Sequence, residues 1–359
     1  MGRVQRRVET VREHLRKLSL DGLMVTHLPN VHYLSGFTGS SGTCLILPDR
    51  AYFVSDGRYL TQSRQEVIGM EILIGADSHL EIMKKKGVLG NGRSVGFEAD
   101  HTSVALMEKM TTLFPSCRWE ATSRLVEKIA AVKDEEEIRL IRKAVEITDD
   151  VFDQIVPELR PGVQEREIAA KISYITRMLG ADGDAFSPIV SSGPNSALPH
   201  AVPSERELQE GDFVVLDFGA RYGGYHADMT RTVVIGSASD RHRDIYDAVR
   251  EAQSRTCRSL RAGMSCREAD SVARDIISQR GYGEQFVHST GHGLGLEVHT
   301  LPRLSQLSDD SLHENYVVTV EPGVYIPDWG GVRIEDDVIV KAYGCEILNQ
   351  SPRDLLVLS

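Results

Sequence analysis

Two aspartates in the second half of the chain lie where a β-hairpin would bring them together. Asp217 ends one apolar segment, and Asp228 precedes the next, after a turn that contains Tyr222 and Gly223. If the hairpin folds about the midpoint of Tyr222 and Gly223, the aspartates are direct cross-strand partners, with Cβ atoms about 4.5–5.5 Å apart. Two facing carboxylates repel each other unless a proton or a cation lies between them. The pattern therefore indicates a metal site, and the alternative is a pair of surface acids.

A glutamate stands at the end of a predicted strand further along the chain. Residues 316–320 are β-branched and aromatic, which is typical of a buried strand. Pro322 and Gly323 follow directly and end the strand, so that Glu321 is held at its tip.

Another glutamate lies within the predicted strand 331–340. Alternation along a strand places Arg333, Glu335 and Asp337 on one face, where Arg333 could orient or neutralise Glu335. The alternative is an exposed polar face on an edge strand.

A histidine-rich segment supplies nitrogen ligands. Three histidines, at His288, His292 and His299, lie close together, although the whole chain has only 12. The glycines between them do not follow the GxGxxG spacing, and no P-loop lysine follows, so a phosphate loop is not indicated. Imidazole together with carboxylates suits Mn, Co, Fe or Zn. Because two neighbouring dications need shared acids, the four acids and one histidine fit a dinuclear site.

The chain is predicted to fold into two domains, and the candidate metal ligands all lie in the second. The first third of the chain alternates strand-like and helix-like segments, which predicts an α/β layer domain over residues 1–126. The second domain, 127–359, begins near a helix capped by Asp134, with Glu137 as in a capping box. The expected strands of the first domain are 22–26, 43–47, 51–54 and 95–97, after a first helix with an apolar stripe of Val4, Val8, Val11, Leu15 and Leu18.

The second domain contains an internal echo. Residues 160–169 and 261–270 match in Arg, Gly, Arg and Glu at one constant offset, and each segment opens an amphipathic helix that ends near Gly180 or Gly281. We interpret the echo as two related halves within one domain, and the alternative is coincidence between two helix-start signals.

Composition excludes several functions. The net charge of -11 argues against binding to nucleic acid or to an anionic membrane surface. The five cysteines form no CxxC pair, which indicates thiols in a reducing compartment. The chain has no apolar run long enough for a membrane span and no signal-like start, so we expect a cytosolic protein.

Several motifs together resemble the pita-bread metallopeptidases, in the branch of Xaa-Pro aminopeptidase (aminopeptidase P) and prolidase. They are LDFGARYGGYHADMTRT (216–232), HSTGHGLGLEVH (288–299), TVEPGVY (319–325) and GVRIEDD (331–337). A looser likeness to the family's creatinase-like domain lies in NVHYLSGFTGSSG (30–42) and SDGRYLTQ (55–62). The resemblance implies an α/β (α+β) chain with a creatinase-like N-terminal domain and a pseudo-two-fold pita-bread catalytic domain.

The resemblance also implies a ligand set. Two divalent ions, Mn or alternatively Co or Zn, would be bound by Asp217, Asp228, His292, Glu321 and Glu335. In the family, residues in the positions of Asp228 and Glu335 bridge the ions, a bridging hydroxide attacks the scissile carbonyl, and the residue at Glu321 also moves a proton.

Further roles follow from the same resemblance. His200 matches a histidine that steadies the tetrahedral intermediate, and His299 matches one that contacts the substrate. His288 matches a histidine near the proline subsite, and Arg333 matches an arginine behind the ligands. Arg303 matches an arginine that contacts a dipeptide carboxylate in some prolidases, whereas an arginine after such a loop is otherwise a surface residue.

The expected activity is hydrolysis of the Xaa-Pro bond at the N-terminus of peptides with proline in second position. The alternative is an Xaa-Pro dipeptidase that acts only on dipeptides, and a non-catalytic interaction protein on this fold is a further alternative. The resemblance also implies a homodimer.

Overall fold

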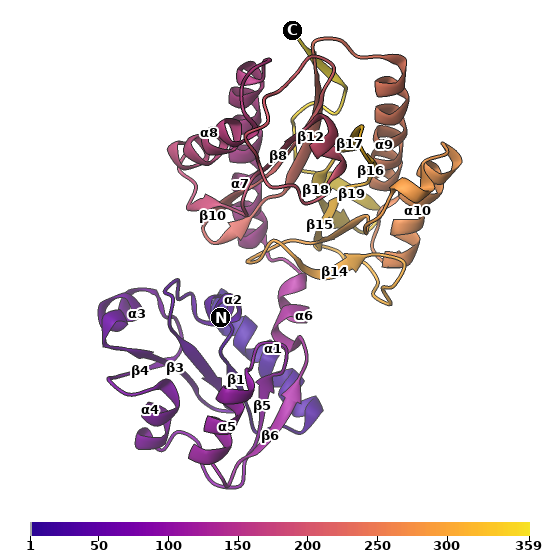
Figure 1. Cartoon of the computed structure of the whole chain (residues 1–359). Coiled ribbons are helices and arrows are strands. Elements are labelled where there is room, and N and C mark those ends of the chain that lie inside the picture. The colour runs from indigo at the N-terminus through magenta and orange to yellow at the C-terminus, as the bar shows by residue number, and fades with distance from the viewer. Residues whose placement is uncertain (1) are drawn as a thin grey trace. The chain divides into compact units, whose positions relative to one another are not determined.

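The computed structural model of the chain describes residues 2–359, which divide into two compact units between Ala130 and Ala131 (Figure 1). The first unit is built on one mixed sheet. In sheet order its strands are β4 (Glu71–Gly75), β3 (Ala51–Asp56), β2 (Thr43–Ile46), β1 (Gly22–Val25), β5 (Ser94–Glu98) and β6 (Arg118–Thr122). Its helices are α1 (Arg3–Leu18), α2 (Leu28–Ser35), α3 (Leu60–Glu66), α4 (His79–Lys86) and α5 (Val104–Leu113), and α6 (Leu125–Ala131) leads out of it.

Helices contact this sheet from two faces. Met24 and Leu45 belong to the apolar core that includes residues of α4 and α5. Because neighbouring strand residues point to opposite faces, Leu23 and Ile46 face the other side, where α1 and α2 contact β1 and β2. The predicted strands of this domain are confirmed, and β4 and β6 were not predicted. Leu18 is the exception in the predicted stripe of α1, because it ends the helix and is 55% exposed.

The second unit has four long helices around two larger sheets, with two smaller sheets beside them. Its helices are α7 (Glu135–Ile155), α8 (Glu165–Met178), α9 (Asp240–Ser259) and α10 (Cys266–Gln279). One sheet has the order β20 (Leu356–Leu358), β12 (Met229–Ile235), β9 (Phe213–Phe218) and β8 (Ile189–Ser192). The other has the order β14 (Thr300–Leu304), β13 (Gly291–Gly293), β15 (Val317–Val320), β18 (Asp336–Lys341) and β19 (Gly344–Ile347). In Figure 1, α7 and α8 lie on one side of these strands and α9 and α10 on the other.

The order of elements repeats within this unit. A helix pair, α7 and α8, precedes β8, β9 and β12, and a second pair, α9 and α10, precedes β13, β15 and β18. Between β9 and β12 lies the hairpin β10 (Ala220–Tyr222) and β11 (Tyr225–His226), whose strand β10 also pairs with β7 (Gly183–Asp184). Between β15 and β18 lies the hairpin β16 (Gly323–Ile326) and β17 (Gly330–Arg333). The helices α8 and α10 begin and end where the internal echo places them.

Capping explains where the second unit's first long helix begins. The Asp134 side chain accepts a hydrogen bond from Glu137 N at 3.0 Å, and the Glu137 side chain accepts one from Asp134 N at 3.0 Å. This capping box satisfies two backbone donors that an uncapped helix leaves without partners. The predicted start of this helix is therefore confirmed.

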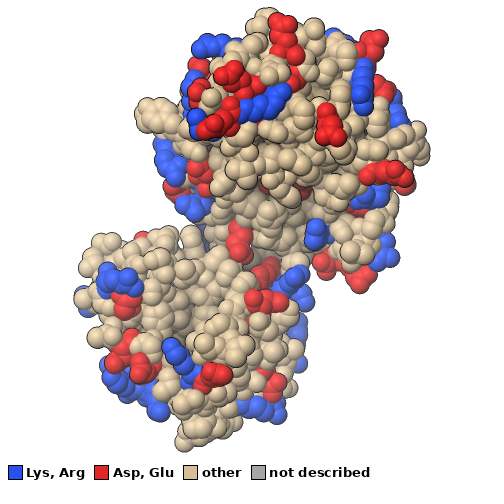
Figure 2. Space-filling view, viewed as in Figure 1, with Lys and Arg blue, Asp and Glu red and all other residues tan. Residues whose placement is uncertain are grey.

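The surface carries charges of both signs. On the face shown in Figure 2, basic and acidic side chains are interspersed over both units. Among residues 2–359, none of the helices has the length and apolarity that a membrane crossing requires.

Candidate metal centre

The hairpin that carries the two aspartates has a different register from the predicted one. Asp217 pairs with Thr230, because Gly223 and Gly224 form the two-residue turn with φ of 56° and 81°. Two successive residues with positive φ are typical of a type I′ turn. The predicted direct pairing of Asp217 with Asp228 is therefore wrong by two residues. A shift of two keeps every side chain on its original face, so both carboxylates still point to the same side.

A close approach between the two chain segments brings Asp228 to the end of β9. A Cβ atom added to Gly219 would lie 1.7 Å from the carbonyl oxygen of Ala227, so only glycine fits there. Asp217 is the fifth residue of β9, and Asp228 lies in the gap between β11 and β12. The two aspartates are 8% and 5% exposed.

The second half supplies two glutamates from equivalent places. Glu321 directly follows β15, as predicted, and Glu335 directly precedes β18. The predicted continuous strand 331–340 is wrong, because the chain leaves one sheet after β17 and joins another at β18. The polar residues of this segment are buried, with Glu335 2% exposed, so the alternative of an exposed edge face is also wrong.

His292 faces this group of acids from β13. Its Nε2 atom lies 3.6 Å from Asp228 Oδ2 and 3.4 Å from Glu321 Oε1. Its Nδ1 atom lies 3.0 Å from the carbonyl oxygen of Gly293, which can only accept a hydrogen bond. This contact requires the proton on Nδ1 and leaves the lone pair of Nε2 directed at the acids. Because burial lowers the pKa of His292, the ring is neutral at pH 7 and suits a metal ligand.

The carboxylates form a site that a cation fits. Ligand atoms of Asp228, His292 and Glu335 all lie within 4.8 Å of one another. Burial, followed by the charge of neighbouring carboxylates, raises the pKa of both Asp228 and Glu335 well above the usual range. The Oδ1 atoms of Asp217 and Asp228 are buried without a hydrogen-bond partner. Buried acids that repel one another and carry free lone pairs are stabilised by divalent cations.

Side chains behind the ligands hold them in place. Arg333, which is 4% exposed, donates a short hydrogen bond to Asp217 and one of 3.0 Å to Thr230 Oγ1. Thr230 in turn donates to Glu335 Oε2 at 2.6 Å. Arg333 therefore contacts Asp217 directly and is linked to Glu335 by hydrogen bonds through Thr230. Its charge also opposes the burial that raises the pKa of Glu335, in agreement with the neutralising role that the sequence pattern suggested.

Sequence reasoning missed two residues that contact Arg333, namely Tyr325 and Thr230. Tyr325 OH accepts a hydrogen bond from Arg333 Nη1 at 2.7 Å and lies 2.9 Å from His288 Nε2. Thr230 lies two residues after Asp228, so alternation along the strand was a signal for its position. Tyr325 lies on the separate hairpin β16–β17, and no local pattern indicated its contact with His288.

The other predicted histidines lie around the same site. His299 has its ring centroid 4.3 Å from that of His292, and His288 is half-buried beside Tyr325. Burial lowers the pKa of His288 and of His299, and nearby His200 lowers both further. His200 is exposed in the turn after Gly193–Ala197.

Arg303 is the direct neighbour of His292 on the adjacent strand of the sheet. The two residues are paired on neighbouring strands β14 and β13, and the Arg303 side chain is exposed. Its Nε atom donates to Ser289 Oγ at 3.4 Å. The structure thus places Arg303 beside the ligand strand rather than on a remote surface.

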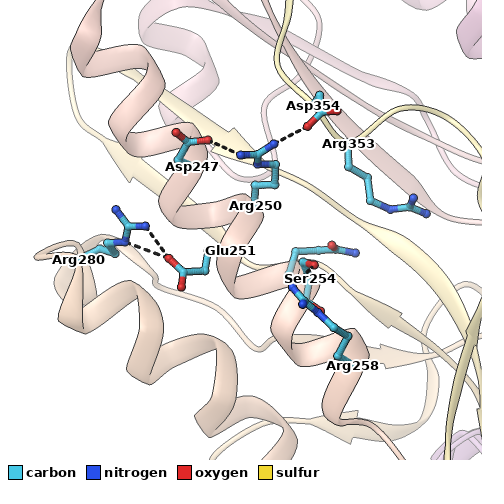
Figure 3. A pocket seen from close by; sticks show the side chains of 9 residues that line it. Asp247, Arg250, Glu251, Ser254, Arg258, Arg280, Arg353 and Asp354 are labelled. Carbon is cyan, nitrogen blue, oxygen red and sulfur yellow. Dashed lines mark hydrogen bonds and ion pairs between the residues drawn. The ribbon is translucent and has the colours of Figure 1, made fainter.

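A groove of about 490 Å³ lies elsewhere in the unit, against α9 (Figure 3). Two of its arginines are paired with carboxylates within the groove, Arg250 with Asp247 and Asp354 and Arg280 with Glu251, whereas Arg258 donates to Ser254. Acidic and basic side chains alternate in this groove, whereas the acid and histidine cluster brings ligand atoms of Asp228, His292 and Glu335 within 4.8 Å of one another, so we take the cluster as the functional site.

Comparisons with known proteins agree with this geometry. The family described as "Metallopeptidase family M24" matches residues 139–342, and the "Creatinase/Prolidase N-terminal domain" matches residues 7–132. The Xaa-Pro dipeptidase of Pyrococcus horikoshii is 36% identical over 350 residues, covering 98% of this chain and 98% of that protein.

Solved structures are similar over the whole chain. An Xaa-Pro dipeptidase from Bacillus anthracis superposes with a TM-score of 0.96 at 41% identity, covering 99% of this chain and 100% of that one. An X-Pro aminopeptidase from Thermotoga maritima superposes with a TM-score of 0.90 at 37% identity, covering 98% of this chain and 99% of that one. The chain belongs to metallopeptidase family M24 and carries the creatinase/prolidase type of N-terminal domain.

Proposed function

We propose that this protein hydrolyses the peptide bond that precedes a proline in second position, with two divalent cations at the acid and histidine cluster. The observation that carries the proposal is the buried group of Asp228, His292 and Glu335, whose ligand atoms lie within 4.8 Å in a chain of family M24. In this proposal Asp217 and Glu321 complete the ligand set, and the catalytic unit is the predicted domain 127–359.

The residues of the site have distinct tasks in this reaction. Two bound cations would supply Lewis acidity toward the scissile carbonyl and lower the pKa of water. Asp228 and Glu335, which lie at equivalent places in the two halves, would be shared between the cations. Burial raises the pKa of Glu321, which suits a group that takes a proton from water and returns it to the leaving amine.

The histidines and Arg333 would act on the substrate and on the ligands. His200 and His299 lie at the exposed side of the cluster, where they can donate hydrogen bonds to a carbonyl oxygen that gains negative charge. His288, held by Tyr325, would line the proline subsite. Arg333 fixes Asp217 and Thr230 and so orients the ligands from behind.

Manganese is the cation we propose, with Co or Zn as substitutes, since one neutral imidazole among carboxylates suits these ions. We also propose a homodimer, on the family resemblance alone, and a cytosolic location, on the five free cysteines, which suit a reducing compartment.

The relatives include enzymes named as dipeptidases and as aminopeptidases, so we propose Xaa-Pro aminopeptidase activity with Xaa-Pro dipeptidase activity as the alternative. Arg303 is the observation that favours dipeptides. It is an exposed cation one strand away from His292, where it can bind the carboxylate that follows proline in a dipeptide.

The choice can be tested with Arg303→Ala on Ala-Pro and Ala-Pro-Ala. If Arg303 binds the dipeptide carboxylate, kcat/KM for Ala-Pro falls about 10–100-fold, as expected for a lost charge-assisted contact, and the value for Ala-Pro-Ala changes little. Arg267→Ala, which removes an exposed arginine of the same unit, is the matched control. Equal losses on both substrates would refute the dipeptide role of Arg303.

A further inference from the structure

Both proposed bridging ligands lie in gaps of the sheet ladders. Asp228 stands between β11 and β12, and Glu335 stands between β17 and β18. The continuous ladder is interrupted in these gaps, and at Glu335 a single backbone hydrogen bond remains, from Glu335 N to the carbonyl oxygen of Thr230 at 3.1 Å. Bridging ligands must nevertheless be held to within a fraction of an ångström. The two gaps therefore need other partners.

The gap at Glu335 is closed by Arg231 from the first half of the unit. Arg231 is 1% exposed, and its Nη1 atom donates to the carbonyl oxygens of Glu335 at 2.5 Å and of Thr230 at 2.9 Å. Its Nη2 atom donates to Asp336 Oδ1 at 2.8 Å and to the carbonyl oxygen of Ser351 at 2.9 Å. One planar guanidinium thus joins the Glu335 backbone to β12 and to the C-terminal segment.

The guanidinium is itself fixed by a buried acid. Asp336, which is 0% exposed, also accepts hydrogen bonds from Gln253 Nε2 at 2.6 Å and from Arg353 Nε at 2.5 Å. A carboxylate that accepts hydrogen bonds from Gln253 and Arg353 as well is fixed in place, and so it holds Arg231 in one orientation.

The gap at Asp228 is closed from the opposite direction. Asp337, which is 0% exposed and lies in the second half, accepts a hydrogen bond from Asp228 N at 2.9 Å through its Oδ2 atom. The backbone N–H of Asp337 donates to Asn349 Oδ1 at 2.7 Å. Arg231 lies three residues after Asp228, and Asp337 lies two residues after Glu335, so each half holds the ligand of the other.

We propose that Arg231 and Asp337 form a cross-clamp, a reciprocal pair of positioning residues that sets the separation of the Asp228 and Glu335 carboxylates. This inference rests on the proposed function, because it assigns the cross-clamp to the two-cation site. Neither residue touches the substrate. Each acts through the backbone of a bridging ligand.

The cross-clamp can be separated from a simple effect of charge. Removing the Arg231 cation would strengthen cation binding if only charge mattered, whereas the cross-clamp requires weaker binding. Arg231→Lys keeps the charge, but an ammonium cannot serve the same four acceptors as the planar fork. Asp337→Asn loses the ionisable carboxyl but keeps an oxygen acceptor for Asp228 N, whereas Asp337→Ala loses both.

The experiment is calorimetric titration of chelator-treated, full-length protein with Mn²⁺, together with kcat and KM for Ala-Pro. We expect Arg231→Lys, Arg231→Met and Asp337→Ala to bind the more weakly held of the two Mn²⁺ ions about 10–100-fold less tightly than wild type. In these variants kcat should fall by a larger factor than KM changes. Asp337→Asn should recover most of the affinity. Arg206→Met breaks another partly buried ion pair, with Asp212, beside β9, and is the matched control that leaves Mn²⁺ affinity unchanged.

The outcomes distinguish the two proposals. Wild-type protein that binds no Mn²⁺ or cleaves no Xaa-Pro peptide would refute the proposed function. Wild-type protein that does both, with folded Arg231→Lys and Asp337→Ala variants that bind Mn²⁺ as tightly as it does, would refute the cross-clamp alone. If Arg231→Met does not fold, the Mn²⁺ affinities of Arg231→Lys and Asp337→Ala still test the cross-clamp.

Discussion

At the residue scale, the site stores electrostatic repulsion that a cation relieves. Asp228 and Glu335 have a raised pKa because burial and then neighbouring carboxylates disfavour their charged forms. In the metal-free protein such a carboxyl binds its proton more tightly when folded than when unfolded. Its ionisation therefore destabilises the fold progressively as the pH rises from about 4 towards the raised folded pKa.

Glu335→Gln tests this repulsion. The amide keeps an oxygen that can accept from Thr230 but removes one charge. We expect the metal-free variant to have a higher Tm than metal-free wild type at pH 7–8, and the difference to shrink as the pH falls through this window. Thermal unfolding in chelator between pH 5 and 8 measures it. A Tm difference that grows toward low pH would contradict the account.

Residue types indicated the acids and the histidine-rich segment, because acids at strand ends beside apolar residues and closely spaced histidines are unusual, and the family resemblance then selected the five ligands from among them. Thr230 and Tyr325 were not predicted, since their importance lies in contacts to Arg333 and His288 that form only in the tertiary structure. The catalytic roles of the individual residues stay predictions.

At the scale of elements, the site is made by breaks in strands. The sequence pattern predicted the strands around the ligands, but it misplaced the hairpin register and merged β17 with β18. The register depended on which two residues form the turn, and Gly223 and Gly224 take that place only because both tolerate positive φ. The break before Glu335 is invisible to alternation, because β17 is buried throughout and β18 is buried up to Val340.

Gly219→Ala tests the close approach that brings Asp228 to β9. The added methyl would meet the backbone of Ala227 at 1.7 Å, which side-chain rotation cannot relieve. We expect a loss of about 1–3 kcal/mol or more of unfolding free energy, with weaker Mn²⁺ binding. Gly344→Ala, where the new methyl meets nothing within 4 Å, is the control. Denaturant unfolding of both variants measures the loss of unfolding free energy. Equally small losses in Gly219→Ala and Gly344→Ala would contradict the account.

At the scale of the whole molecule, the five proposed ligands all belong to the unit that begins at Ala131. The unit up to Ala130 has its own sheet and apolar core. A cation that binds only the folded second unit stabilises that unit by mass action, by about 2.7 kcal/mol per site at one hundred times Kd.

We therefore expect Mn²⁺ to raise the unfolding temperature of the second unit more than that of the first. Calorimetry of the full chain with and without Mn²⁺ can detect this when the transitions separate, and limited proteolysis of the two units serves when they do not. Equal protection of both units would contradict the placement of all five ligands in one unit.

The measurement that tests the central claim most directly is hydrolysis of Ala-Pro, Ala-Pro-Ala and Ala-Ala-Ala by purified protein, stripped of metal and reloaded with Mn²⁺. The account predicts Mn²⁺-dependent cleavage of at least one proline substrate, little cleavage of Ala-Ala-Ala, and loss of activity in Glu335→Ala. Absence of cleavage of both proline substrates, in protein shown to contain two Mn²⁺ per chain, would contradict it.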